Sequence, residues 1–375
     1  MAAPKYPIDI QSFSEIINGD YLYVDKTALI HKMAQDYQYV FLSRPQRFGK
    51  SLLCSTLTEY LSGNKDLFKG LAIEQLEQKW TKHPVLSFSF EPAYKVNKQS
   101  LNAFIGSMLA KYEQEYGITP SSNDNGERLN NIIKTARKKS KQKVAVIIDA
   151  YDTPVLGSIQ DSDLVCDVHN TIGSFLAPLD SLAKDLRFVF VTGEIHYATR
   201  CYRNALSKIH DITHQVDYDT ICGFTNDEVT NNLPHDIQGF ADVQSWTFDE
   251  ALKWFGNIYG GYNFSKELRT VFNPGSLLCS LHTKKTEIFW PKAASAIGLI
   301  KMTEKMFEVT MSNFDGIQCT ADRFEIEAEE NLDLVPFLVQ AGYLTFKNFE
   351  IFNNTEYYTL RYANKEIRAV VKQIG

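Results

Sequence analysis

The residues that could carry chemistry begin with Gly49-Lys50-Ser51, which lie between a short apolar run and an amphipathic segment. Backbone N–H groups at a helix N-terminus bind phosphate oxygens, a lysine reaches the terminal phosphates, and a hydroxyl ligates Mg²⁺. The triplet supplies all three groups and therefore predicts a phosphate-binding loop. The full P-loop pattern has a further glycine where this chain has Arg44. A helix N-terminus with an exposed lysine is the alternative interpretation.

An acidic residue follows a second apolar run. Residues 144–148 form a nearly continuous apolar stretch of the kind that is buried on both faces of a parallel sheet, and Asp149 comes next. We predict that Asp149 and Ser51 hold Mg²⁺, and that Lys50 and Asp149 act in catalysis. ATPases of this kind often have a glutamate at the following position to orient the attacking water, whereas this chain has Ala150.

Two more residues are candidates for catalytic roles. Asp152 could assist the attacking water or the metal, or it could be a turn residue before Thr153-Pro154. Thr192 comes at the end of another apolar run and is a candidate sensor of the terminal phosphate. A threonine that simply ends a strand is the alternative for that position.

The elements that must position these residues alternate between strands and helices. Apolar runs predict strands at 39–43, 85–90, 143–148 and 187–192, and helical spacing is found at 52–61, 100–116 and 165–182. This alternation predicts an α/β fold, with a P-loop NTPase-like parallel sheet flanked by helices. Ligands of such sheets lie at the carboxyl ends of the strands.

The pattern changes at Gly223, where Thr225 and Glu228 have the spacing of a helix capping box. We predict three units, which are a P-loop ATPase-like domain at 1–222, a mostly helical, lid-like region at 223–310, and a small α+β unit at 311–375. In the last unit a helix at 332–339 precedes two strand-like runs joined at Asn353-Asn354. That order fits a winged helix or an ordinary α+β cap.

Composition excludes several classes of protein. The chain has 375 residues, a formal net charge of −6, 44% hydrophobic and 13% aromatic residues, which excludes a disordered chain and argues against coating nucleic acid through bulk charge. No run approaches the roughly 18 apolar residues of a membrane span, and the N-terminus has no apolar core of a signal peptide. We therefore expect a cytoplasmic protein. Six scattered cysteines without a CxxC pair indicate buried free thiols.

Eight segments occur together in this chain, at 23–27, 43–51, 66–71, 148–152, 222–225, 259–262, 272–278 and 341–344. In this order they resemble the predicted AAA-ATPase-like proteins of bacteria and some other microbes, which are often joined to a C-terminal nuclease domain of the PD-(D/E)XK type. The loop of that family typically reads R-P-x-R-F-G-K-[ST], so Arg44 fits it.

The resemblance implies ATP and Mg²⁺ as cofactors. It implies a cofactor-binding loop made of Arg44, Gln46, Arg47, Phe48, Gly49, Lys50 and Ser51. It also implies an attached or separate effector, plausibly a nuclease, as partner. The chain departs from the family at Ala150, where a glutamate is usual, so we expect ATP binding with little hydrolysis. No Asp followed by Glu-x-Lys occurs after residue 330, and the chain ends at Gly375, about where a nuclease domain would begin, so nuclease activity is not predicted.

Other patterns leave alternatives open. Residues 134–143 include six basic side chains, which could contact phosphates or nucleic acid, or could form a solvated helix end. Arg200 and Arg203 could be arginine fingers, within the molecule or toward a second copy, or an exposed pair. His210 and His214 have the spacing of a zinc-binding helix. The rival to an ATP-binding protein is a scaffold that binds nucleic acid or protein without nucleotide.

Overall fold

A five-stranded parallel sheet lies at the centre of the computed structural model, which describes residues 5–94, 96–158, 161–196, 206–290, 314–324 and 333–374. The strands are β1 (Tyr39–Ser43), β2 (Val85–Ser89), β3 (Val144–Asp149), β4 (Leu186–Gly193) and β5 (His210–Asp211). Their order in the sheet is β2-β3-β4-β1-β5. Because β4 pairs with both β1 and β3, the carboxyl ends of these three strands lie side by side at one edge.

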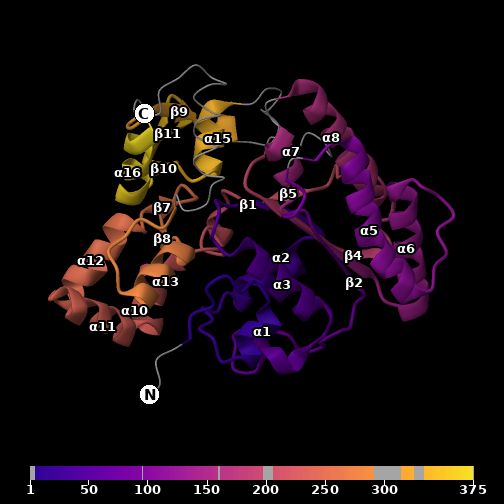
Figure 1. The fold of residues 1–375 in the computed structure, drawn as a ribbon, viewed down its shortest axis with the longest axis horizontal. Helices are drawn as coiled ribbons and strands as arrows, with labels where there is room; N and C mark the ends of the chain where they lie inside the picture. Colours follow the sequence, from indigo (N-terminus) through magenta and orange to yellow (C-terminus); the bar gives the residue numbers. More distant parts are fainter. Residues whose placement is uncertain are drawn as a thin grey trace.

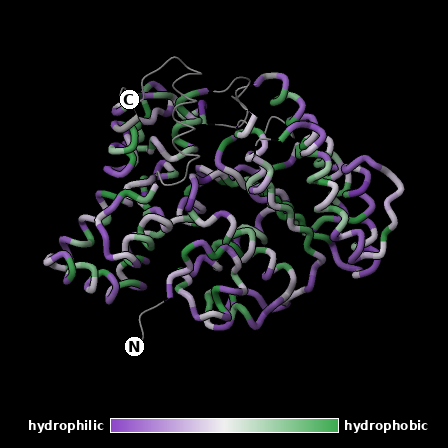
Figure 2. The backbone as a smooth tube through the Cα atoms, viewed as in Figure 1, coloured by the Kyte–Doolittle hydropathy of each residue, from purple (hydrophilic) through white to green (hydrophobic). Residues whose placement is uncertain are grey.

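Helices cover both faces of this sheet (Figure 1). The first group consists of α1 (Phe13–Asn18), α2 (Thr27–Asp36) and α3 (Lys50–Leu61), and the second of α5 (Lys98–Tyr116), α6 (Asn125–Ser140) and α8 (Ser162–Leu176). Successive residues of a strand point to opposite faces. Val40 and Leu42 accordingly pack in the cluster of the first group, and Tyr39 and Phe41 in that of the second. In Figure 2 the central strands are correspondingly hydrophobic along their length.

The strands confirm the α/β fold expected from the sequence. Each predicted strand is present to within one residue at either end, and Gly117 ends α5 in the left-handed conformation. The segment predicted as one helix at 165–182 is wrong in its extent, because α8 ends at Leu176 and a short helix, α9 (Pro178–Ser181), follows. Proline has no N–H to continue the helical hydrogen bonding, so the break falls just before Pro178.

Short helices and a small antiparallel sheet follow the main sheet. The helices are α10 (Asn226–Asn232), α11 (Pro234–Gln244), α12 (Phe248–Ile258) and α13 (Pro274–Thr283), and the strands are β6 (Phe224–Thr225), β7 (Tyr262–Asn263) and β8 (Thr270–Phe272). The predicted capping box is present, since the backbone N–H of Thr225 donates to Glu228 and that of Glu228 donates to the Thr225 hydroxyl. In the part of the chain that the structure describes, no helix has both the length and the apolar character needed to cross a membrane.

The last elements form an α+β unit that packs against the loop after β1. It contains β9 (Gln318–Thr320), α15 (Leu334–Gln340), β10 (Leu344–Phe352), β11 (Thr355–Tyr362) and α16 (Lys365–Ile374). Asn353 and Asn354 both have positive φ and join β10 to β11, as the sequence predicts. Gly342 precedes β10 with a φ of +83°, and a Cβ placed on it would lie 2.7 Å from Cβ of Pro45.

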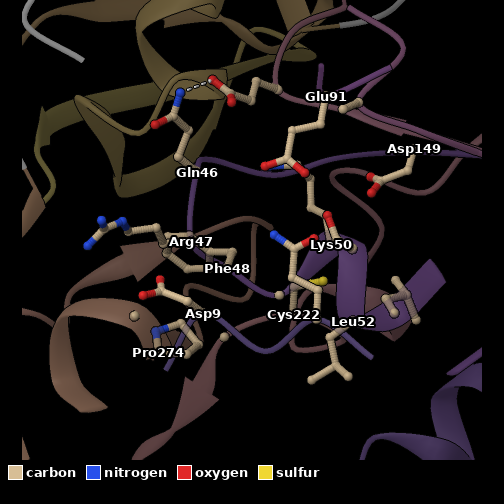
Figure 3. A pocket seen from close by; sticks show the side chains of 18 of the residues that line it. Asp9, Gln46, Arg47, Phe48, Lys50, Leu52, Glu91, Asp149, Cys222 and Pro274 are labelled. Carbon is tan, nitrogen blue, oxygen red and sulfur yellow. Dashed lines mark hydrogen bonds between the residues drawn. The ribbon is translucent and has the colours of Figure 1, made fainter. Parts of the chain in front are cut away.

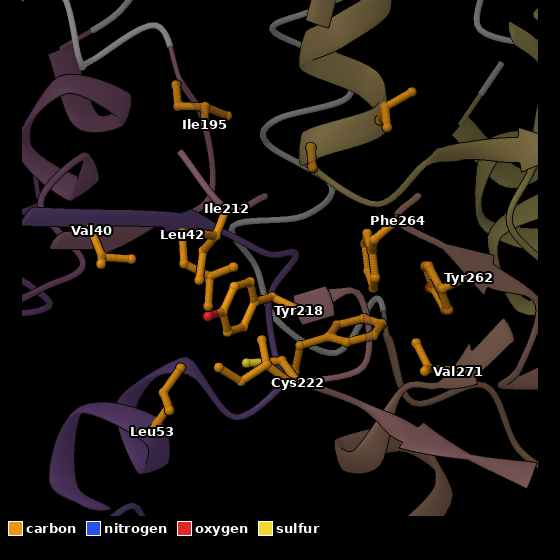
Figure 4. Packing of buried hydrophobic residues seen from close by; sticks show 14 of the residues in the cluster. Val40, Leu42, Leu53, Ile195, Ile212, Tyr218, Cys222, Tyr262, Phe264 and Val271 are labelled. Atoms are coloured by element: carbon orange, nitrogen blue, oxygen red, sulfur yellow. The ribbon is translucent and has the colours of Figure 1, made fainter. Parts of the chain in front are cut away.

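One hydrophobic cluster continues from the main sheet into this α+β unit. It includes Leu42 and Phe48 near the end of β1, Phe264 after β7, and Leu338 and Phe346 of the α+β unit. Figure 4 shows Leu42 and Cys222 packed in the same cluster as Tyr262 and Phe264. The boundaries expected at 222 and 310 stay predictions, and this cluster extends across both.

We expect Gly342→Ala to lower the free energy of unfolding by about 2–5 kcal/mol. The left-handed backbone costs an L-residue about 1–2 kcal/mol, and the new methyl group would overlap Pro45, which adds about 1–3 kcal/mol. Gly316→Ala is the matched control, because Gly316 has a φ of +88° but no atom of the described residues lies within 4 Å of an added Cβ. Urea unfolding measures both losses, and equal losses would contradict tight packing of Gly342 on Pro45.

Candidate functional site

The loop between β1 and α3 has the order of strand, loop and helix that the sequence predicts. Gly49 is the residue before α3 and has a φ of +89°, and an added Cβ would meet no atom of the described part of the chain within 4 Å. Arg47 is also left-handed, with a φ of 63°. The space in front of the N-terminus of α3 is therefore open.

That open space is part of a cavity of about 930 Å³ (Figure 3). One side is formed by residues 46–51 of the loop, and another by residues at or just after the carboxyl ends of strands, which are Glu91, Asp149, Ala150 and Glu194. Residues 7–11 and 22–24, Lys26, and residues of α13 close the remaining sides. The cavity thus lies where ligands of parallel sheets are bound.

The carbonyls of the loop are held by donors from later parts of the chain. The Gln46 carbonyl accepts a hydrogen bond from Asn273 Nδ2, the Arg47 carbonyl from the Gly275 N–H and the Phe48 carbonyl from the Gly223 N–H, each at 3.3 Å. In a trans peptide the C=O and the next N–H point in opposite directions. The N–H groups of residues 47–49 therefore turn away from these donors and toward the other side of the loop.

Lys50 lies across the beginning of the same loop. Its Nζ donates to the carbonyls of Arg44 at 2.8 Å and Pro45 at 3.0 Å. The ammonium group of the lysine thus marks the end of the loop at which a P-loop lysine meets the terminal phosphates.

Asp149 ends β3 and lines the cavity. Its side chain is buried, with 6% of its surface exposed, and Oδ1 has no hydrogen-bond partner among the described residues. Burial raises the pKa of this carboxyl, while the Ser51 hydroxyl and the Lys50 ammonium lower it. An unpaired carboxylate oxygen beside a serine hydroxyl is a donor set that suits Mg²⁺, so the residues present fit this ion.

Arg44 points away from the cavity. Its guanidinium is fully buried, donates to the carbonyls of Ser43 and Thr213 at 2.8 Å and of Tyr218 at 3.0 Å, and lies 4.2 Å from the ring centre of Phe264. Burial lowers the pKa of Arg44 to about 10. In this position it supports the base of the loop, and its contact with a nucleotide stays a prediction.

Asp152 and Thr192 also lie behind the cavity wall. Asp152 Oδ2 accepts hydrogen bonds from the backbone N–H groups of Glu194 at 2.6 Å and Ile195 at 2.8 Å. The Thr192 hydroxyl donates to the Leu42 carbonyl at 2.7 Å. Both side chains therefore fix the ends of strands, and their catalytic roles stay predictions.

Glu194 is a functional candidate that the sequence reasoning missed. It lines the cavity, and Gln46 Nε2 donates to its Oε2 at 3.3 Å. Burial and, to a smaller extent, the Asp152 carboxylate raise the pKa of Glu194 to about 7, although the Lys50 ammonium opposes this. A signal was available, because Glu194 immediately follows the carboxyl end of β4, where the rule for parallel sheets places ligand-binding residues.

The remaining sequence candidates lie elsewhere. His210 is in strand β5, where it pairs with Val40, so the helical zinc spacing with His214 is wrong. The last turn of α6 carries Arg137, Lys138 and Lys139, which is a favourable place for positive charge at a helix C-terminus. Arg200 and Arg203 lie outside the described residues.

Comparison with known proteins adds two findings. Residues 7–200 match a family model described as "Predicted AAA-ATPase". The whole chain is also similar to an uncharacterized protein in the vnfD 5' region of Azotobacter chroococcum mcd 1, with 28% identity over 379 residues that cover 100% of this chain and 70% of that protein.

We expect Glu194→Gln to change how stability depends on pH. Between the ordinary value of 4.5 and the folded pKa of about 7, the folded protein holds a proton that the unfolded chain has released, so the free energy of unfolding falls as pH rises through this window. Glutamine has no such proton. Between pH 5 and pH 7.5 the free energy of unfolding of the wild type should therefore fall by about 1–2 kcal/mol more than that of the variant, after allowance for partial solvent screening.

Chemical unfolding at several pH values measures this difference. Glu91→Gln is the control, because Glu91 lines the same cavity but is exposed. Parallel curves for the wild type and Glu194→Gln would contradict the raised pKa.

Proposed function

This chain belongs to the predicted AAA-ATPase family, and on that premise we propose that it binds Mg·ATP in the cavity before α3. One observation carries the proposal. Residues 46–49 of the loop, Lys50 and Asp149, whose Oδ1 has no hydrogen-bond partner among the described residues, all line a single cavity. Phosphate oxygens need donors, a lysine and a cation in such an arrangement.

The residues of the site would divide the work of binding. The N–H groups at the start of α3 bind phosphate oxygens, and Lys50 exchanges its bonds to the Arg44 and Pro45 carbonyls for the terminal phosphates. Ser51 and Asp149 are the residues that would hold Mg²⁺, which when bound neutralises phosphate charge. The far wall of the cavity includes the apolar side chains of Ile8, Leu22, Phe224 and Leu278, which suit a nucleotide base.

We further propose that ATP binding controls an effector through the α+β unit. This unit contacts the phosphate loop at Gly342 and Pro45, and the Gln340 side chain accepts a hydrogen bond from the His196 N–H at 2.9 Å, just beyond β4. A displacement of the loop would therefore displace the residues between α15 and β10 that pack against it. A nuclease, attached or separate, is the effector class that the family resemblance implies. A winged-helix character of residues 311–375 and a cytoplasmic location belong to the same proposal.

Position 150 bears on whether this control involves fast hydrolysis. Ala150 lines the cavity but has no carboxylate to orient water. We therefore propose a protein that binds ATP tightly and turns it over slowly, so that the bound state persists long enough to hold a conformation.

A scaffold without nucleotide is the alternative. Ile351 and Phe352 at the end of β10 are 63% and 66% exposed, which fits a surface that binds another macromolecule. Nucleic-acid or protein binding that ignores ATP would favour this alternative, and for nucleic acid such binding would also weaken with salt.

Binding of Mg·ATP is tested by calorimetric titration with Mg·ATP and Mg·GTP. We expect Lys50→Ala to weaken ATP binding by about tenfold or more, since a charge-assisted hydrogen bond contributes about 1.5–3 kcal/mol. Lys253→Ala is the matched control, because Lys253 is exposed on α12, far from the residues that line the cavity. No heat from either nucleotide with the wild-type chain would leave the scaffold alternative.

Coupling to the α+β unit is tested by amide hydrogen exchange. We expect Mg·ATP to slow exchange by about threefold or more at residues 273–275 and 341–344, because binding stabilises the loop on which they pack. Lys50→Ala should abolish the effect, and α5 serves as an internal reference on the other face of the sheet. Protection confined to residues 44–51 would contradict control through the α+β unit.

A further inference from the structure

We propose that Glu194 is the catalytic carboxylate of this chain, which orients the water that attacks the terminal phosphate of ATP. The inference rests on the proposed binding of Mg·ATP and goes beyond it, because it assigns hydrolysis to a residue outside the β3 strand. Glu194 would supply the slow hydrolysis of a chain in which Ala150 has no suitable group.

The position of Glu194 follows from Lys50 and Gln46. Lys50 Nζ is bonded to the Arg44 and Pro45 carbonyls, so the terminal-phosphate end of the site is the beginning of the loop. Gln46 is the next residue, and its side chain donates to Glu194 at 3.3 Å. The Glu194 carboxylate therefore lies at the end of the cavity where the attacking water must stand.

Glu194 is also held in place. Its N–H donates to Asp152 at 2.6 Å, and its carbonyl accepts a hydrogen bond from the Ser43 hydroxyl. The backbone is thus fixed to β1 on one side and to the segment after β3 on the other, while the side chain is oriented by Gln46. A group that orients water needs such fixed geometry.

The other carboxylates near the site are less suited to this role. Asp149 is the residue proposed to hold Mg²⁺, and Asp152 is buried with its Oδ2 occupied by two backbone N–H groups. Glu91 follows β2, which pairs with β3 on the side away from β4. Its negative charge raises the pKa of Asp149, and its side chain is exposed. Figure 3 shows Glu91 and Gln46 on the cavity wall and marks the hydrogen bond from Gln46 to a carboxylate, which is that of Glu194.

The step balances with water as the only co-reactant. The water oxygen forms a bond to the γ-phosphorus, and the bond between this phosphorus and the oxygen that bridges to the β-phosphate breaks. That electron pair leaves with ADP, and a proton of the water passes to the Glu194 carboxylate, which later releases it to solvent. The products are ADP and inorganic phosphate.

The test measures the dissociation constant of Mg·ATP and the single-turnover hydrolysis rate with the full chain. Glu194→Gln keeps a polar group that can hydrogen-bond to Gln46 but cannot accept the proton as a carboxylate does. We expect the hydrolysis rate to fall by about a hundredfold or more, as for the loss of a general base, with the ATP dissociation constant changed less than about threefold. Glu91→Gln is the competing substitution, because Glu91 lines the same cavity, and its rate should fall less than that of Glu194→Gln. Glu115→Gln is the control, because Glu115 is exposed on α5 and does not line the cavity, and it should keep the rate within about threefold.

A double substitution separates this role from a structural one. Ala150→Glu should raise the hydrolysis rate. Adding Glu194→Gln to Ala150→Glu should lower the rate by a smaller factor than Glu194→Gln does in the wild type, because the new carboxylate at position 150 then orients water. An unchanged rate in Glu194→Gln, or a loss confined to Glu91→Gln, with ATP still bound, would overturn the role of Glu194 alone. Absence of ATP binding by the wild-type chain would overturn the proposed function and this inference together.

Discussion

The shape of the phosphate loop depends on hydrogen-bond donors that come from distant parts of the chain. Only one glycine stands between β1 and α3, and the loop is otherwise made of large residues and a proline. The carbonyls of residues 46–48 are bound by Asn273, Gly275 and Gly223, and the base of the loop rests on the buried guanidinium of Arg44. Without these partners a buried carbonyl would cost about 1–3 kcal/mol, so the loop and its surroundings must fold together.

This dependence explains why the segments that resemble the AAA-ATPase-like family lie far apart in the sequence. Residues 222–225, 272–278 and 341–344 contain no group that a phosphate requires, yet each of them contacts the loop through Gly223, Gly275 or Gly342. At Gly275 and Gly342 a Cβ would lie under 3 Å from an atom of Arg47 or Pro45, so only glycine fits without displacement. The second half of the chain therefore completes the site that the first half begins.

The sequence predicts the parts of this structure that depend on local patterns. Strands apolar at every position, such as residues 144–148, can only be buried on two faces, and Gly49 with Lys50 marks where a helix starts. The inward position of Arg44 was not predictable in this way, and for Glu194 the pattern indicates only that it follows the carboxyl end of β4. The Glu194 side chain accepts a hydrogen bond from Gln46, which belongs to the loop after β1. The Arg44 guanidinium donates inward to the carbonyls of Thr213 and Tyr218, more than 160 residues later in the sequence. Such contacts are made by the tertiary fold.

The contact between Gly342 and Pro45 has a consequence for whatever binds the α+β unit. Coupling free energy between two sites is reciprocal, so if ATP shifts the α+β unit by a given factor, a ligand of that unit shifts the affinity for ATP by the same factor. The loop has little freedom to absorb such a shift, because its carbonyls are held on the same side. A partner of residues 333–374 would therefore act as an exchange or retention factor for the nucleotide, without touching the phosphates.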